Sequence, residues 1–182
     1  MKMGRFEKRF VNTASHSSRV AEQAHQLLQA ANPQPGQQLL DVGCGNGTAP
    51  IHLAQTLGLA VTGIDVDTEQ IEAAAAKGNG VAAVRFLAAD ATRLPFADDE
   101  FDLVYTNKTT HHIRDWQRAL TEMTRVLKPD GYLLYSDFVA PLGHRLPTRR
   151  ALKRFAHQHE LETVRRSGSP FHYTSIFRKA QR

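Results

Sequence analysis

A glycine-rich turn between an apolar run and a helical segment constrains this chain more than any other feature. In the stretch LLDVGCGNGTAPIHLA (39–54), Gly43, Gly45 and Gly47 directly follow the apolar run. Glycine adopts left-handed backbone conformations without steric cost, so this spacing predicts a tight turn that joins a buried strand to a helix. Turns of this kind at strand ends bind ligands in several classes of α/β protein.

Short apolar runs and helical patterns alternate along most of the chain. The apolar runs, each of strand length, lie at 38–42, 60–65, 83–89, 101–106 and 131–138. Helical patterns follow Thr48, begin at Asp67 with a capping-box pattern to Gln70, and begin again at Asp115. This alternation predicts βαβ units, and therefore a parallel sheet with helices on both faces and a ligand site at the carboxyl ends of the strands.

The two ends of the chain depart from this alternation. A helical pattern that contains Leu152 and Phe155 precedes two strand patterns at 160–168 and 171–179. The few residues between these strands cannot form a crossover helix, so the strands should pair antiparallel. Near the other end, residues 15–31 predict a helix that lies across the ligand edge of the sheet.

Composition and charge narrow the class of protein. With 182 residues, 41% apolar residues and no long uncharged apolar run, we expect one globular domain without a membrane span. A single cysteine, Cys44, cannot form an internal disulfide, and no secretory signal pattern is apparent, so we expect a cytoplasmic protein. The net charge is +3 over residues 1–36, −6 over 37–140 and +8 over 141–182. Basic ends suggest contact with something anionic, although a solvated surface explains them equally well.

The residues around the glycines separate the possible ligands. A nucleoside triphosphate turn ends in Gly-Lys-Ser/Thr, but here Thr48 follows Gly47 and no lysine is near. A dinucleotide turn requires its third glycine at position 48 and a helix N-terminus free to receive a pyrophosphate. Asp41 would repel such an anion. The same carboxylate would attract a cationic ligand, such as the sulfonium nucleosides that also bind at glycine turns of this kind.

With these residues in place, the stretch resembles the first motif of the class I S-adenosylmethionine-dependent methyltransferases of the type 11 kind. Further motifs of that family follow in order, in VTGIDVD (61–67), FLAADATRLPFADDEFDLVYTN (86–107) and LTEMTRVLKPDGYLLYSDF (120–138). The resemblance implies an α/β, Rossmann-like fold with seven strands in the order 3-2-1-4-5-7-6, mostly parallel with the last strand antiparallel, and helices on both faces. The expected single domain spans 1–182, with an N-terminal helical lid (1–36), a cofactor-binding core (37–138), and a helix with a terminal hairpin (139–182).

The resemblance implies S-adenosyl-L-methionine as cofactor and S-adenosyl-L-homocysteine as product. Asp65 would accept hydrogen bonds from the ribose hydroxyls, because a carboxylate can accept two at once. Asp90 with Ala91 would read the adenine, and Asn107 would contact the amino-acid part. Asp41 would orient the glycine turn or reach the methionine amine. The full expected cofactor-binding set is Asp41, Gly43, Gly45, Gly47, Asp65, Val66, Asp90, Ala91 and Asn107.

The segment TNKTTHHI (106–113) departs from the family pattern, in which an apolar run often precedes the histidines. It should lie at the mouth of the site, beside the transferred methyl group. His111 and His112 are the candidates for a general base, which a hydroxyl acceptor would need near pH 7. Packing and hydrogen bonding at a helix start are the alternative roles. No metal is expected, because adjacent side chains diverge and no third ligand is spaced nearby.

These features predict an enzyme, an S-adenosylmethionine-dependent methyltransferase with a small or anionic acceptor. Arg145 and Arg149 belong to a basic cluster that could bind a carboxylate or phosphate of the acceptor. A small-molecule acceptor is the expected partner; nucleic acid and a homodimer are compatible, but no RNA-binding motif occurs. The alternatives are an RNA or protein methyltransferase, and a cofactor-binding regulatory or interaction protein without transfer activity. Methylation of oxygen, nitrogen, carbon or sulfur stays open.

Overall fold

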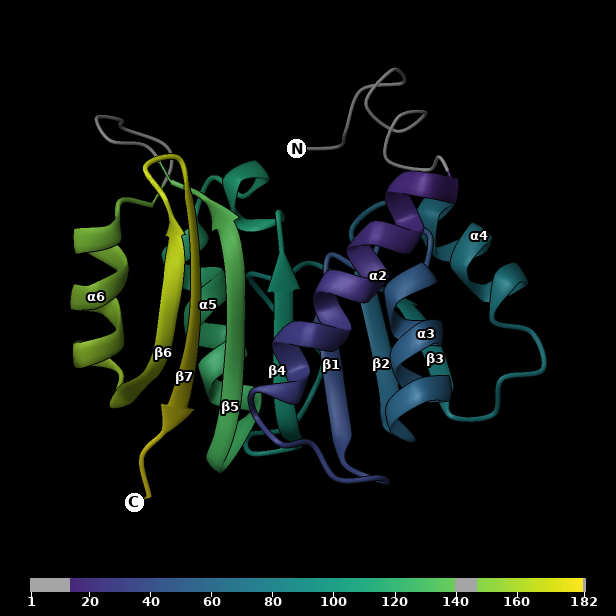
Figure 1. Ribbon diagram of the computed structural model, residues 1–182, viewed down its shortest axis with the longest axis horizontal. Coiled ribbons are helices and arrows are strands. Elements are labelled where there is room, and N and C mark those ends of the chain that lie inside the picture. The colour runs from purple at the N-terminus through teal and green to yellow at the C-terminus, as the bar shows by residue number, and fades with distance from the viewer. Residues whose placement is uncertain (1–13, 140–146, 182) are drawn as a thin grey trace.

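The computed structural model describes residues 14–139 and 147–181, which form one seven-stranded sheet flanked by helices (Figure 1). The strand order is β3-β2-β1-β4-β5-β7-β6, as predicted. The strands are β1 (Gln38–Val42), β2 (Ala60–Asp65), β3 (Val84–Ala88), β4 (Phe101–Asn107), β5 (Leu127–Phe138), β6 (Leu161–Ser169) and β7 (His172–Lys179). Strands β1 to β5 are parallel, whereas β7 pairs antiparallel with both β5 and β6.

Helices cover both faces of the sheet and bury two apolar clusters. The helices are α2 (Ala14–Gln29), α3 (Thr48–Leu57), α4 (Thr68–Lys77), the short η1 (Thr110–His112), α5 (Trp116–Val126) and α6 (Arg149–Gln158). On one face, Leu28 of α2 and Leu53 of α3 are fully buried in a shared cluster. On the other face, Met123 of α5 and Phe155 of α6 belong to the second cluster. Both helical faces follow the apolar spacing of the sequence.

Helix α2 differs from its predicted placement. Instead of lying across the ligand edge, it packs along one face of the sheet, with its N-terminal end at that edge (Figure 1). The reason is its stripe of small and apolar residues: Ala21, Ala24 and Leu28 are at most 3% exposed and pack with residues of β1 and α3. Only burial against the sheet removes such a stripe from water. The predicted lid, residues 1–36, includes residues outside the described range and stays a prediction.

The start of α4 also differs from the expected capping box. Asp67 caps the helix, since its carboxylate accepts from the Glu69 amide at 3.2 Å. The amide of Asp67 donates to Asp65 at 3.0 Å, however, and not to Gln70. In a capping box Gln70 would accept that bond. Asp65 therefore supplies the acceptor that Gln70 would supply in a capping box. Its hydrogen bond links the end of β2 to the start of α4.

The two terminal strands pair antiparallel through a short turn, as predicted. β6 extends to Ser169 and β7 begins at His172, so only Pro170 and Phe171 join them. β5 likewise begins at Leu127, before the expected position, and a bulge adjusts its pairing with β4. The register then places the carboxyl end of β5 beside the segment that follows β4.

The buried side chain of Lys179 binds the end of this hairpin to the rest of the sheet. Its removal should lower the free energy of unfolding. Lys179 is 6% exposed, and its ammonium donates to the Asp99 carboxylate at 2.7 Å and to the Thr124 and Leu127 carbonyls. We expect Lys179→Met to lower the free energy of unfolding by about 3 kcal/mol, because three acceptors lose their donor. Denaturant titration measures this. The control Lys153→Met, at an exposed site on α6, should change stability by less than about 0.5 kcal/mol, and equal effects of the two variants would refute the assignment.

Candidate active site

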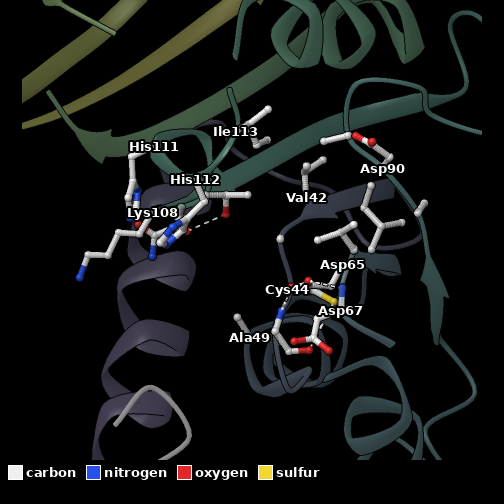
Figure 2. A pocket seen from close by; sticks show the side chains of 18 of the residues that line it. Val42, Cys44, Ala49, Asp65, Asp67, Asp90, Lys108, His111, His112 and Ile113 are labelled. Carbon is white, nitrogen blue, oxygen red and sulfur yellow. Dashed lines mark hydrogen bonds between the residues drawn. The ribbon is translucent and has the colours of Figure 1, made fainter. Parts of the chain in front are cut away.

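A cavity of about 620 Å³ lies at the carboxyl ends of the parallel strands. Its walls come from the turn after β1, the ends of β2 and β3, and the segment after β4, with Ser17 and Val20 of α2 at one side. Figure 2 shows Lys108 and the two histidines on one side of the cavity, and the aspartates of β2 and the β3 loop on the other. The cavity therefore lies where open α/β sheets bind ligands.

The three glycines of the turn have left-handed backbones but different surroundings. Their φ values are 82°, 53° and 76° at Gly43, Gly45 and Gly47. A Cβ at Gly43 would lie 2.2 Å from Thr109 Oγ1, and one at Gly47 would lie 2.7 Å from Ala74 Cβ. At Gly45 the nearest atom would be 3.9 Å away, and this residue lines the cavity. Internal packing thus explains the glycine at 43 and 47, whereas Gly45 leaves the cavity wall open to a ligand.

Asp65, at the end of β2, holds the glycine turn in place. One carboxylate oxygen accepts from the Gly45 amide at 3.0 Å, and the other accepts from the Asp67 amide at 3.0 Å. Each oxygen keeps lone-pair capacity for a further donor. Because Asp65 also lines the cavity, its carboxylate can accept hydrogen bonds from a ligand while it orders the turn.

Most other residues predicted for the cofactor meet in the same cavity. Asp90 accepts from the Thr92 amide and hydroxyl, both at 2.8 Å, and these bonds hold the pKa of its carboxyl below the usual value. Val66 is 51% exposed beside it and offers an apolar surface. The predicted residues that line the cavity are Gly43, Gly45, Asp65, Val66, Asp90, Ala91 and Asn107. Gly47 and Asp41 are not among the lining residues.

Asp41 is a buried carboxyl behind the turn. It is 3% exposed, and no donor among the described residues forms a hydrogen bond with it. Burial, and secondly the charge of nearby Asp65, raises the pKa of Asp41 to about 8. A buried carboxyl of this kind favours a cationic group in its neighbourhood, because such a group would stabilise the ionised form.

The raised pKa of Asp41 predicts a pH dependence of stability. The folded protein binds more protons than the unfolded chain between about pH 4, the ordinary value, and about pH 8. Stability should therefore fall as pH rises through this window, by up to about 1.4 kcal/mol per pH unit from this group. Asp41→Asn removes the titration, so the variant should gain stability relative to the wild type from pH 5 to pH 8.5. Denaturant unfolding at both pH values tests this, and a constant difference would contradict it.

His111 is joined to a residue that the sequence analysis missed. Its Nδ1 lies 2.6 Å from Asp137 Oδ1, and Asp137 Oδ2 accepts from the Thr110 hydroxyl at 2.6 Å and the His111 amide at 3.2 Å. Although burial raises the pKa of Asp137, the hydrogen bonds from His111 and Thr110 hold it below the usual value. The carboxylate fixes the imidazole with Nδ1 inward, so Nε2 is the nitrogen available to a ligand. His111 lines the cavity.

The sequence did carry a signal for Asp137. This aspartate lies near the carboxyl end of the apolar run 131–138, at the edge where ligands bind in parallel sheets. The second predicted histidine, His112, also lines the cavity, with its ring centre 3.9 Å from that of His111.

Of the two arginines predicted to bind the acceptor, only Arg149 is described, and it does not line the cavity. Arg145 lies outside the described residues. Arg149 donates to the Ser169 and His172 carbonyls, and its guanidinium lies 5.7 Å from the centre of the Tyr173 ring. Arg149 therefore joins α6 to the terminal hairpin, and it is not among the residues that line the cavity.

Within residues 14–139 and 147–181, no group of three or more His, Cys, Asp or Glu side chains is placed to hold a metal ion. No helix within these ranges combines the length and the apolar character that a bilayer crossing requires.

Comparison with known proteins gives the family. A family model described as "Methyltransferase domain" matches residues 40–135, more than half of the chain and nearly all of the parallel sheet. The chain belongs to this methyltransferase family. The match begins just before the glycine turn and ends in β5, so the cofactor motifs of the type 11, S-adenosylmethionine-dependent methyltransferases fall within it.

Similar methyltransferases act on several kinds of acceptor, according to their names. This methyltransferase domain is 42% identical over 132 residues to O-methyltransferase resE of Aspergillus sclerotiorum, covering 71% of this chain and 48% of that protein. It is 33% identical over 134 residues to phosphoethanolamine N-methyltransferase 1 of Arabidopsis thaliana, covering 73% of this chain and 26% of that protein. The chain thus spans about half or less of the length of these relatives.

Solved structures of low sequence identity share the fold of this methyltransferase. A SAM-dependent methyltransferase from Aquifex aeolicus superposes with a TM-score of 0.79 at 21% identity, covering 97% of this chain and 99% of the other. The [4+2]-cyclase SpnF superposes with a TM-score of 0.80 at 21% identity, covering 88% and 80%. At this identity the likeness concerns the fold, and the reaction must be argued from the site.

Proposed function

We propose that this chain is an S-adenosylmethionine-dependent O-methyltransferase that acts on the hydroxyl of a small molecule. The observation that carries the proposal is the His111–Asp137 pair at the cavity wall. A hydroxyl is a poor nucleophile near pH 7 and needs a base, whereas a neutral amine or a thiolate needs little help. The O-methyltransferases among the relatives support the same acceptor class.

The acidic side of the cavity fits the cofactor. Asp65 has acceptor capacity for ribose hydroxyls, Val66 and Asp90 offer an apolar surface and an acceptor for adenine, and Gly45 leaves room for close approach. A positively charged ligand bound near the buried Asp41 would stabilise the ionised form of its carboxyl and so lower its raised pKa. Bound there, S-adenosylmethionine would supply an electrophilic methyl group, because its sulfur carries a positive charge.

His111 then has two tasks in this proposal. Its Nε2 accepts the proton that the acceptor hydroxyl loses, and it passes this proton to solvent after transfer. Asp137 holds the ring in the tautomer with the proton on Nδ1 and stabilises the imidazolium that forms. Thr110 donates to the same carboxylate and also contacts the Tyr135 hydroxyl at 2.9 Å, so this pair is held by neighbouring side chains.

A cofactor-binding protein without transfer activity is the second candidate. The fold neighbour named as a cyclase supports it, because that name indicates a reaction other than methyl transfer on a similar fold. The two candidates differ in product: only a methyltransferase forms S-adenosylhomocysteine as it methylates the acceptor.

The test is to incubate the protein and S-adenosylmethionine with hydroxyl or amine acceptors and to measure the formation of S-adenosylhomocysteine. Phenol and alcohol probes are compared with ethanolamine and phosphoethanolamine. We expect turnover with hydroxyl probes, with the methyl group on oxygen by mass spectrometry. Turnover restricted to the amines would refute O-methylation. Binding of S-adenosylmethionine in calorimetry, without product from any probe, would favour the second candidate.

A further inference from the structure

We propose that Lys108 recognises an anionic group on the acceptor, so that the preferred substrate carries a carboxylate or phosphate beside an apolar body and the reacting hydroxyl. This inference rests on the proposed function, and it names a substrate class and a specificity-determining residue. Lys108 lines the cavity, whereas Arg149, which the sequence predicted for this role, contacts the terminal hairpin.

The backbone of Lys108 is held in an unusual conformation at the site. Lys108 follows the last residue of β4 and has φ 51°, a left-handed value that is uncommon for a residue with a side chain. Its amide donates to the Ser136 carbonyl of β5 at 2.8 Å, which fixes the chain between the two central strands. This hydrogen bond to β5 thus fixes the backbone position from which the Lys108 side chain extends.

The lysine, an apolar ring and the candidate base converge at one place. The Lys108 ammonium lies 5.7 Å from the centre of the Phe138 ring, and the His111 ring lies 5.2 Å from the same centre. Phe138 is 40% exposed, and all three residues line the cavity. An acceptor whose apolar body packs on Phe138 therefore has both Nε2 of His111 and the ammonium of Lys108 within reach.

No carboxylate of the described residues, 14–139 and 147–181, neutralises the positive charge of Lys108. Asp137, the partner of His111, is already bonded to His111 and Thr110. Asp65, Asp67 and Asp90 lie on the opposite side of the cavity (Figure 2). Asp115, which also lines the cavity, accepts a hydrogen bond from the Arg118 amide. An uncompensated ammonium in a partly enclosed pocket attracts an anion and disfavours a cationic acceptor.

Two charge-removing variants test the inference. Lys108→Asn suits the left-handed backbone, because asparagine tolerates positive φ better than most residues. The control Lys153→Gln removes one positive charge from the exposed side of α6, outside the cavity. Affinity for S-adenosylhomocysteine, measured by calorimetry, reports whether each variant keeps its fold and cofactor site.

The assay uses a metabolite extract divided by anion exchange into retained and unretained fractions, with S-adenosylhomocysteine formation as readout. We expect the acceptor in the retained fraction. Lys108→Asn should raise its KM about tenfold to hundredfold with a much smaller change in kcat, as loss of a charge-assisted contact does. Lys108→Arg should restore most of the affinity, Lys153→Gln should behave as wild type, and added salt should raise KM for the wild type but not for Lys108→Asn.

The possible failures are distinguishable. Turnover of an unretained, neutral acceptor, or an unchanged KM in Lys108→Asn, would overturn the role of Lys108 and leave the proposed O-methylation intact. A retained acceptor methylated on nitrogen, with KM raised in Lys108→Asn, would refute O-methylation and support Lys108. Absence of S-adenosylhomocysteine from every fraction would refute the proposed function and this inference with it.

Discussion

His111→Ala is expected to lower kcat for methylation of a hydroxyl about 10²-fold to 10⁴-fold, the usual contribution of a general base. The variant removes the only nitrogen that the structure aligns against a buried carboxylate at the cavity wall within the described residues. Affinity for S-adenosylmethionine should change little, because Asp65 and Asp90, the residues proposed to bind the ribose and the adenine, lie on the other side of the cavity (Figure 2). Single-turnover kinetics and calorimetry measure the two quantities separately.

Two companion variants make this expectation specific. Asp137→Asn keeps the shape of the side chain but removes the charge that stabilises the imidazolium, so kcat should also fall steeply. His112→Ala changes the neighbouring histidine that lines the same cavity, and it should have a much smaller effect. A loss of kcat in His112→Ala that matches or exceeds that of His111→Ala would transfer the role of base to His112.

Asp65→Ala is expected to weaken binding of S-adenosylmethionine and S-adenosylhomocysteine at least about 100-fold, since hydrogen bonds to a charged group contribute about 1.5–3 kcal/mol each. Two losses combine in this variant. The ribose would lose its acceptor, and the Gly45 and Asp67 amides would lose the carboxylate that orders the turn and the start of α4. Calorimetric titration with S-adenosylhomocysteine gives the dissociation constant without turnover.

The control for Asp65 is an aspartate outside the cavity. Asp98→Ala removes an exposed carboxylate that pairs with Arg125, and it should leave cofactor affinity unchanged. Equal affinities of Asp65→Ala and wild type would refute the ribose assignment. A weakened variant whose thermal unfolding matches the wild type would show that the loss lies in ligand contacts and not in global stability.

The sheet could be predicted from the sequence because its elements are defined by patterns within short stretches of the chain. Strand and helix patterns alternate, the terminal strands are too close for a crossover, and the family motifs give the strand order. The glycine turn placed the cavity at the carboxyl edge for the same reason, since that turn directly follows a strand.

The acceptor side could not be predicted in this way, because it depends on register between distant segments. The pairing of Asn107 with Ser136 brings the end of β5 beside η1 and so places Asp137 against His111. Nothing in the local pattern of 106–113 gives this partner. The contacts of Arg149 could not be predicted for a related reason. The hairpin carbonyls that accept hydrogen bonds from its guanidinium belong to residues 169 and 172, which are distant in the sequence.

The contact between Gly43 and Thr109 has a consequence for engineering. The side chain of Thr109 occupies the space that a Cβ at Gly43 would need, with its Oγ1 2.2 Å and its Cγ2 2.4 Å from that position. The loop that follows β4 therefore packs directly against the glycine turn. A chimera that imports this loop from another methyltransferase to change the acceptor must carry a residue no bulkier than threonine at position 109, or the imported loop will displace the glycine turn.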